Sequence, residues 1–210
     1  MGRKQEYRGK EIVVHFDAAL CMHAGLCVRT LPKVFEAHVE GPWIHPDAAD
    51  VEALVALIES CPSGALYYEK EDRSEPVPDI NSVTVEKDGP LTIHADFTLN
   101  GIKPAAPRAT LCRCGASKNP PYCDGSHSEA GFSEHGKVAA FNPDDQQPSG
   151  ILEIKTLKNG SLYLQGPHTI CDASGAVSRV CKKSALCRCG ATHMPPYCDA
   201  SHASIAFKAD

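Results

Sequence analysis

Cys112-Arg-Cys114-Gly-Ala-Ser-Lys-Asn-Pro-Pro-Tyr-Cys123-Asp-Gly-Ser-His127 is the stretch that decides the fold, and the chain contains it twice. The second copy begins 75 residues later and reads Cys187-Arg-Cys189-Gly-Ala-Thr-His-Met-Pro-Pro-Tyr-Cys198-Asp-Ala-Ser-His202. Each copy holds three thiols and one imidazole at the same spacing, and these are metal-ligand types. The repeated pattern therefore predicts two metal sites and an internal duplication.

The duplication reaches beyond the ligands. Leu111 matches Leu186 and Phe132 matches Phe207 at the same offset. Each copy is too short to bury a core of its own, so we expect the two copies to need each other.

Bulk composition excludes several classes of protein. The chain has 210 residues, eleven cysteines and a formal net charge of -5, which does not indicate a nucleic-acid surface. The odd number of cysteines argues against a complete set of internal disulfides. No secretory signal is visible, and the apolar run at 12–16 is too short to span a membrane. We expect a cytoplasmic protein, where clustered Cys and His serve as metal ligands.

Periodicity and turn residues predict the local elements. We expect a helix that Asp47 caps and that ends near Ser60, with Val51, Leu54, Val55 and Ile58 on one face. Lys158-Asn159-Gly160 is a hairpin signal. Charged, proline-containing segments predict linkers at 69–79 and 142–150. The expected strands are 12–16, 65–68, 83–85, 91–93, 152–154 and 162–164.

Ligand identity leaves two kinds of site open for the duplicated pattern. Three Cys and one His form a known structural zinc set, although zinc ligands usually come in two knuckles with two or more residues between them. Here two Cys are separated by one residue, and the Cys–His pair follows after eight residues. We expect that second pair at the start of a helix, whose free N–H groups favour a negative cluster. A binuclear [2Fe-2S] centre with two ligands on each iron is favoured over zinc.

The residues between the ligands resemble the signature of the CDGSH iron-sulfur domain, the mitoNEET family. Residues 112–127 match it throughout, and residues 187–202 match it except at Ala200, where the family has Gly. The resemblance implies one [2Fe-2S] cluster per motif, held by the three Cys and the His. It also implies an internal pseudo-dimer, because mitoNEET-like proteins pair two chains that each carry one motif. Alanine tolerates a positive φ poorly, so Ala200 is expected to alter the local turn without abolishing binding.

Three further cysteines precede the duplication. Cys21-x5-Cys27 and Cys61-Pro62, with the residues around them at 12–68, resemble the divergent single-cluster ferredoxin domain. A full [4Fe-4S] site takes four Cys, but Ala24 occupies the middle position. Cys21, Cys27 and Cys61 therefore favour a [3Fe-4S] cluster. The alternatives are a [4Fe-4S] cluster completed by His23, water or an external ligand, and three buried thiols with no metal.

Other residues carry weaker expectations. Arg113 and Arg188, between the paired Cys, either offset cluster charge or donate to cluster sulfurs, or are simply solvated. Asp124 and Asp199 are further candidates for contacts around the ligands. Cys171 and Cys181 fall outside the repeat and are expected to be ordinary thiols, and Trp43 is expected in the core rather than facing a cofactor.

These observations predict an α+β protein. We expect a small ferredoxin-like α/β domain at 1–78 and CDGSH units at 79–141 and 142–210, built mostly of strands and loops with short helices. The expected function is electron transfer or cluster transfer to redox or apo iron-sulfur proteins, with no catalytic residue, by a monomer that binds neither nucleic acid nor membrane. The alternatives are a zinc-stabilised interaction module and the redox component of a larger enzyme.

Overall fold

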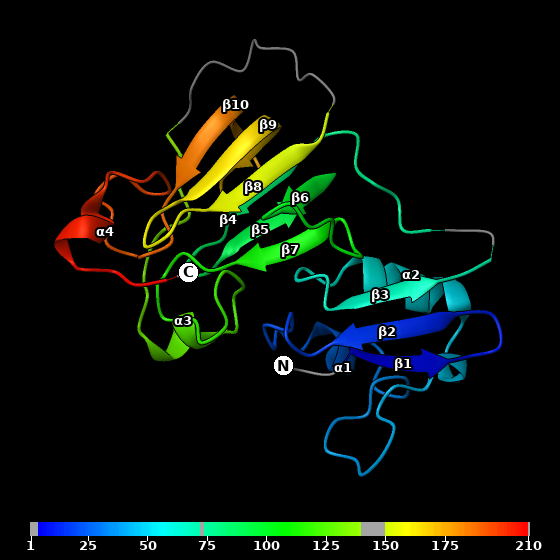
Figure 1. Cartoon of the computed structure of the whole chain (residues 1–210). Coiled ribbons are helices and arrows are strands. Elements are labelled where there is room, and N and C mark those ends of the chain that lie inside the picture. Colours follow the sequence, from blue (N-terminus) through cyan, green and yellow to red (C-terminus); the bar gives the residue numbers. More distant parts are fainter. Residues whose placement is uncertain (1–3, 72–73, 140–149, 210) are drawn as a thin grey trace.

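The computed structural model describes residues 4–71, 74–139 and 150–209 and contains two separate sheets (Figure 1). The first sheet has three antiparallel strands in the order β1 (Lys4–Arg8), β2 (Val13–Asp17) and β3 (Leu66–Glu69). Helix α2 (Val51–Glu59) packs on it through an apolar face, and Leu54, Val55, Leu57 and Ile58 are its buried residues. The short helices α1 (Leu26–Thr30) and η1 (Pro46–Ala48) complete this N-terminal domain.

The predicted helix is present, but its cap was assigned to the wrong residue. Asp50 precedes the helix and accepts hydrogen bonds from the N–H groups of Glu52 and Ala53 at 3.1 and 3.2 Å. Asp47 lies in η1 and accepts instead from the N–H of Lys10 at 2.8 Å. Pro46 begins a separate short turn, so the α-helix starts later than predicted. It ends before Ser60, as predicted.

The second sheet draws its seven strands from both copies of the duplication. Its order is β6-β8-β9-β4-β5-β7, with β10 paired to β9. Strands β8 and β9 form parallel pairs with β6 and β4 of the first copy. The two copies therefore share one sheet and one core. The first copy supplies β4 (Ser82–Val85), β5 (Leu91–His94), β6 (Phe97–Leu99) and β7 (Arg108–Leu111); the second supplies β8 (Leu152–Thr156), β9 (Leu162–Cys171) and β10 (Val177–Leu186).

Every predicted strand lies within or overlaps an observed one, and the predicted hairpin joins β8 to β9. Asn159 adopts a φ of 52° there, as the turn requires. The α+β class is confirmed, with sheet predominating and helices short. Strands β1, β6, β7 and β10 were not predicted.

The first predicted linker is not free chain. Glu75, within 69–79, pairs with Arg108 of β7, and their side chains are only 9% and 5% exposed. An ion pair this deeply buried holds the segment against the sheet. Residues 72–73, and 142–149 of the second predicted linker, lie outside the described residues. Within the described residues, no helix is long and apolar enough to cross a membrane.

Candidate metal centres

Each duplicated motif is a loop between a strand end and a one-turn helix. The N–H of Cys112, just after β7, donates to Pro121 O at 2.8 Å, and the N–H of Cys123 donates to Thr110 O at 2.9 Å. His127 lies in α3 (Ser126–Glu129). The second motif repeats these bonds after β10 and ends in α4 (Ser201–Ser204). Backbone pairing thus folds the eight-residue gap back, and the two ligand helices, α3 and α4, lie beyond the same end of the larger sheet (Figure 1).

The predicted ligands come together as pairs. In the first motif, Cys112 Sγ lies 3.6 Å from Cys114 Sγ, and Cys123 Sγ lies 3.3 Å from His127 Nδ1. A single tetrahedral zinc ion would hold all four ligand atoms roughly 3.5–3.8 Å from one another. In the described residues, no three His, Cys, Asp or Glu side chains gather around one such point. The donor set, two Cys in one pair and Cys with His in the other, fits a group with two metal ions.

The second motif repeats this geometry. Cys187 Sγ and Cys189 Sγ are 3.5 Å apart, and Cys198 Sγ lies 3.4 Å from His202 Nδ1. The same nitrogen of the imidazole faces the sulfur in both copies. Two independent stretches of chain therefore present the same donor set in the same arrangement.

The two motifs meet at their second cysteines. Cys114 and Cys189 form an isolated antiparallel bridge. The neighbouring glycines pack reciprocally: a Cβ on Gly115 would lie 2.8 Å from Cys189 O, and one on Gly190 would lie 2.7 Å from Cys114 O. Both glycines have φ near 80°, where only glycine is unstrained.

The three N-terminal cysteines line one largely apolar cavity. Cys21 and Cys27 flank a loop with left-handed residues at His23 and Gly25, and Cys61 follows α2. Burial raises the pKa of Cys21 and Cys27, and Coulombic repulsion from Cys61 adds to the rise in both. The structure therefore brings these cysteines together, as the spacing predicted.

Comparison with known proteins decides the family. Residues 88–128 and 159–203 match the family described as "Iron-binding zinc finger CDGSH type". CDGSH iron-sulfur domain-containing protein 1 of Mus musculus is 31% identical over 87 residues, which cover 38% of this chain and 74% of the mouse protein. The chain belongs to the CDGSH iron-sulfur domain proteins. The predicted recognition of two CDGSH motifs is confirmed.

The N-terminal domain matches a second iron-sulfur family. Residues 7–71 match the family described as "Divergent 4Fe-4S mono-cluster". The uncharacterized protein YjdI of Escherichia coli (strain K12) is 48% identical over 62 residues, which cover 30% of this chain and 80% of that protein. The predicted divergent ferredoxin domain is thereby confirmed as a family assignment. No solved structure matches the chain.

The structure overturns one of the two interpretations of the CDGSH arginines, that they are solvated; that they offset cluster charge stays a prediction. Arg113 and Arg188 are only 4% and 3% exposed, so they are not solvated. Their Nε atoms donate to Gly89 O and Gly160 O, both at 2.7 Å, rather than to sulfur. Arg113 also pairs with Glu134. The arginines clamp the neighbouring hairpin turns by donating to backbone carbonyls, Arg113 also to Glu86 O and Arg188 also to Leu157 O.

Aromatic rings complete the two clamps. Arg113 lies 5.0 Å from the ring centre of Phe132, and Arg188 lies 5.6 Å from that of Phe207. This explains why the duplication includes these two phenylalanines. The clamped turns are also repeated: Lys87-Asp-Gly89 matches Lys158-Asn-Gly160. This match has an offset of 71 rather than the 75 of the ligands, so a search at the ligand offset does not find it.

The aspartates of the CDGSH motifs organise the ligand loops. Asp124 accepts from the N–H of Lys118 at 2.8 Å and from that of Ser126 at 3.0 Å. Asp199 makes the equivalent bonds with His193 and Ser201 at 2.9 and 3.0 Å. Partial burial opposes ionisation of Asp124, but these backbone bonds outweigh it and lower its pKa. Hydrogen bonds from Ser201 and from His193 lower the pKa of Asp199.

Burial and hydrogen bonds between neighbouring thiols shift the pKa values of the motif cysteines. A hydrogen bond from Cys114 lowers the pKa of Cys112 to about 6, while the pKa of Cys114 rises because its neighbour takes the charge first. Burial raises the pKa of Cys123 and of Cys189 to about 11. A bound metal ion would replace these protons and stabilise the thiolates.

The remaining predicted positions divide clearly. Cys171 and Cys181 are buried thiols of β9 and β10, outside the residues of the two motifs, as predicted. Trp43 packs against Phe16 with ring centres 4.9 Å apart, but it also lines the N-terminal cysteine cavity. Trp43 thus packs against the N-terminal core, as predicted, and that it does not face a cofactor stays a prediction. The CDGSH helices differ at their caps, where Gly125 and Ala200 both have positive φ, 89° and 69°.

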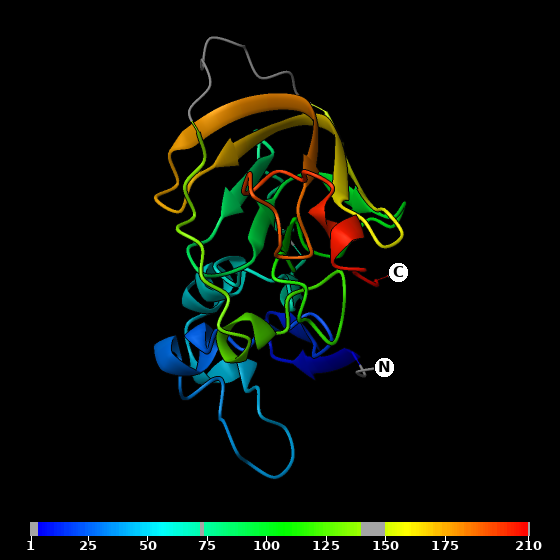
Figure 2. The ribbon, with the colours of Figure 1, turned by 90° about the vertical axis from the view of Figure 1, so that its left-hand side faces the viewer.

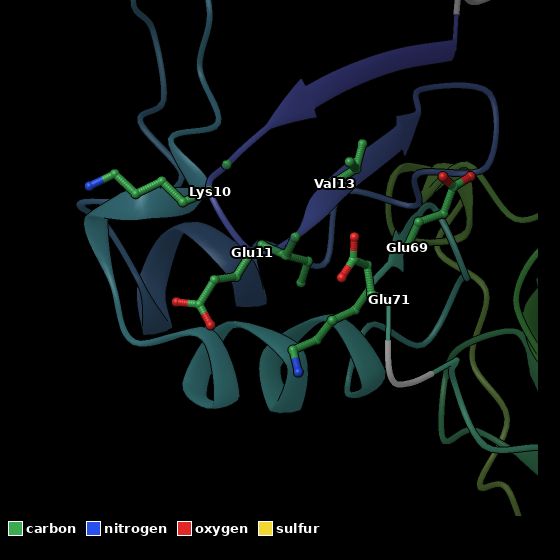
Figure 3. A pocket seen from close by; sticks show the side chains of 8 residues that line it. Lys10, Glu11, Val13, Glu69 and Glu71 are labelled. Atoms are coloured by element: carbon green, nitrogen blue, oxygen red, sulfur yellow. The ribbon is translucent and has the colours of Figure 1, made fainter.

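A broad surface hollow beside β2 and β3 is unrelated to the cysteines (Figure 3). Lys10, Glu11, Glu69 and Glu71 line it with charges of both signs, and its lining residues include no thiol or imidazole.

Sequence reasoning missed Arg108, Glu75 and the contacts of Gly125, because these depend on packing between segments far apart in the chain.

Proposed function

We propose that this protein is a carrier holding two [2Fe-2S] clusters, one in each CDGSH motif. Cys112, Cys114, Cys123 and His127 would hold the first, and Cys187, Cys189, Cys198 and His202 the second. The observation that carries the proposal is the division of each ligand set into two pairs, 3.3–3.6 Å apart within each pair. Family membership supports the same ligand assignment.

We propose a third cluster, [3Fe-4S], at Cys21, Cys27 and Cys61, with [4Fe-4S] as the alternative. Three thiols around one cavity support the three-iron form. Ala24 lines the cavity where a fourth Cys would stand, and the exposed His23 beside it is the candidate ligand for a fourth iron.

The proposed role is electron transfer or cluster transfer to a redox protein or an apo iron-sulfur protein. When bound, a [2Fe-2S] centre accepts and returns single electrons. The chain buries the thiols of Cys112, Cys123 and Cys187 and leaves His127 and His202 partly exposed. A carrier is favoured over an enzyme, since the residues described here assemble ligands rather than a substrate site.

We also propose that the two motifs are related by an approximate twofold axis within a monomer. The reciprocal contacts of Gly115 and Gly190 with Cys189 and Cys114 support this, because each glycine packs against the same atom of the other copy. A twofold relation is what equal and opposite contacts produce.

Iron and acid-labile sulfide analysis of anaerobically purified protein tests the cluster content. About seven irons per chain fit two [2Fe-2S] and one [3Fe-4S], and about eight fit a cubane. A colourless protein with zinc and no sulfide would contradict the proposal. Electron paramagnetic resonance of the oxidised protein separates the N-terminal alternatives, because only the three-iron cluster is paramagnetic in that state.

Incubation with an apo-ferredoxin distinguishes the two carrier roles. Cluster transfer moves the visible absorbance to the acceptor, which can be separated by size. Electron transfer leaves the absorbance on the donor and changes only its oxidation state when a cluster-loaded acceptor is supplied.

A further inference from the structure

The N-terminal domain contacts the first CDGSH motif directly beside its ligands. Met22, which follows Cys21, directs its carbonyl oxygen at Gly125, where an added Cβ would lie 3.1 Å from that oxygen. Asn119 Nδ2 donates to Ala19 O at 2.5 Å. The cysteine loop of one domain therefore rests on the ligand loop of the other.

A third contact reaches the remaining N-terminal cysteine. Arg108 donates to the carbonyl oxygen of Cys61 and, at 3.2 Å, to that of Leu66. Glu75 holds the same guanidinium through both carboxylate oxygens. Strand β7, which carries Arg108, leads within four residues to Cys112. The contact thus joins the backbone of one expected ligand to the strand that positions another.

The three residues of the first copy that make these contacts are all replaced in the second copy, although the ligands are unchanged. Each replacement is exposed, and Met194, which stands where the first copy has Asn119, is 63% exposed. Helix α3 lies toward the N-terminal domain and α4 lies away from it in both views (Figures 1 and 2). The replacements for Arg108, Asn119 and Gly125 are Lys183, Met194 and Ala200.

Comparison with Ala200 indicates why position 125 is glycine. Both residues cap a ligand helix with a positive φ, so the CDGSH backbone accepts alanine at this place. What alanine would disturb at 125 is the approach of the Met22 carbonyl, because a Cβ contact of 3.1 Å is unusually tight. The departure from the family pattern therefore falls in the copy that the N-terminal domain does not touch.

We propose that Arg108, Asn119 and Gly125 fix the N-terminal cysteine centre beside the first CDGSH motif, which makes this motif its partner within the chain. The inference rests on the proposed function in one respect: electrons exchanged inside the protein by the N-terminal domain enter or leave through the first motif. In that exchange one electron leaves the reduced centre and enters the oxidised one, and no bond forms or breaks.

An exchange of residues between the copies tests this in the full chain. Asn119→Met with Gly125→Ala gives the first motif the second motif's residues at two contacts. The matched control is Met194→Asn with Ala200→Gly. Hydrogen exchange is measured by mass spectrometry for residues 18–28. We expect several-fold faster exchange there in the first double variant and unchanged exchange in the control.

A spectroscopic measurement follows the centres themselves. In dithionite-poised wild-type protein, we expect the N-terminal centre to speed the spin relaxation of the first CDGSH centre more than that of the second. The two CDGSH signals are assigned with Cys112→Ser and Cys187→Ser. Loss of this difference in Asn119→Met/Gly125→Ala, with iron content unchanged, supports the proposal.

Two results would overturn it. One is unchanged exchange and relaxation in the first double variant. The other is equal relaxation of both CDGSH centres in the wild type. A wild-type protein without iron and sulfide contradicts the proposed function instead, and the exchange measurement still tests the contact in that case. Arg108→Lys provides a second variant, with the same expected direction of change.

Discussion

Cys114 and Cys189, which hold the same place in the two motifs, face each other across an antiparallel bridge. The adjacent glycines leave no room for a side chain, since each would meet the carbonyl of the opposite cysteine at 2.7–2.8 Å. The junction therefore depends on the absence of two Cβ atoms, and the separation of the metal centres depends on the junction.

Gly115→Ala should be far more damaging than Gly101→Ala. Both glycines have φ near 80°, but a Cβ at 101 meets nothing within 4 Å. Backbone strain alone costs about 1–2 kcal/mol, which lowers Tm by about 2–8 °C in a chain of this size. Gly101→Ala should show only that loss, and Gly115→Ala should exceed it, because a backbone carbonyl must also move. Equal Tm values for the two variants, by calorimetry, would contradict the tight junction.

His127→Cys and His202→Cys should slow the acid-induced loss of visible absorbance. Acid protonates the ligating imidazole nitrogen in competition with iron, and a thiolate replaces it with a negative ligand. The double variant should also have a lower reduction potential, because thiolate adds charge to the centre. Stopped-flow absorbance between about pH 5 and 8 measures the decay. The same pH dependence in variant and wild type would contradict the assignment of His127 and His202 as metal ligands.

Arg113→Met should destabilise the protein by about 3–5 kcal/mol, because it leaves the Glu134 carboxylate and two carbonyls without their buried partner. Arg8→Met is the control, since the Arg8 side chain is 74% exposed and its ion pair contributes about 0–1 kcal/mol. Thermal unfolding compares the two. If Arg113→Met cost no more than Arg8→Met, the clamp on the hairpin would not be needed for stability.

His168→Gln should flatten the dependence of stability on pH below neutrality. Burial lowers the pKa of His168, whose neutral ring donates from Nδ1 to Gly166 O and accepts at Nε2 from Ser184. The unfolded chain then binds the proton more readily, so stability falls as pH drops below about 6.5 and until the folded-state pKa is passed. Above pH 6.5 the variant and wild type should have parallel profiles. Tm measured from pH 5 to 8 gives the slopes; His38→Gln, at an exposed site outside the ligand loops, is the control.

Cys171→Ala and Cys181→Ala should retain the full iron content, whereas Cys112→Ala should lose about two irons per chain. The first two thiols are buried in β9 and β10 and belong to neither ligand set. Burial raises the pKa of each, which keeps them protonated and unreactive at neutral pH. Iron analysis of the three purified variants checks this. Loss of iron from Cys171→Ala would mean that the ligand set extends beyond the repeat.

Local patterns allowed much of the fold to be predicted. Alternation placed β4, β5, β8 and β9, and the helical spacing of apolar residues placed α2. The cap of α2 was misassigned because Asp47 and Asp50 both precede apolar residues, and only packing shows which of them faces the free N–H groups. Strand β10 was missed because its polar residues do not alternate in the expected way. It forms a strand because its backbone hydrogen-bonds to β9, which the residue pattern of β10 does not predict.

The ligand spacing by itself determined which residues make up both CDGSH sites, because residues within one short loop are bound to lie close together, and the residues between the ligands indicated the family. The tertiary structure alone decided how the two copies share a sheet, why Arg113 and Arg188 are buried, and which motif lies against the N-terminal domain. Those contacts join residues that are dozens of positions apart, such as Met22 with Gly125 and Cys61 with Arg108. Local spacing does not predict these contacts, because they depend on how the surfaces of the N-terminal domain and the first motif pack together.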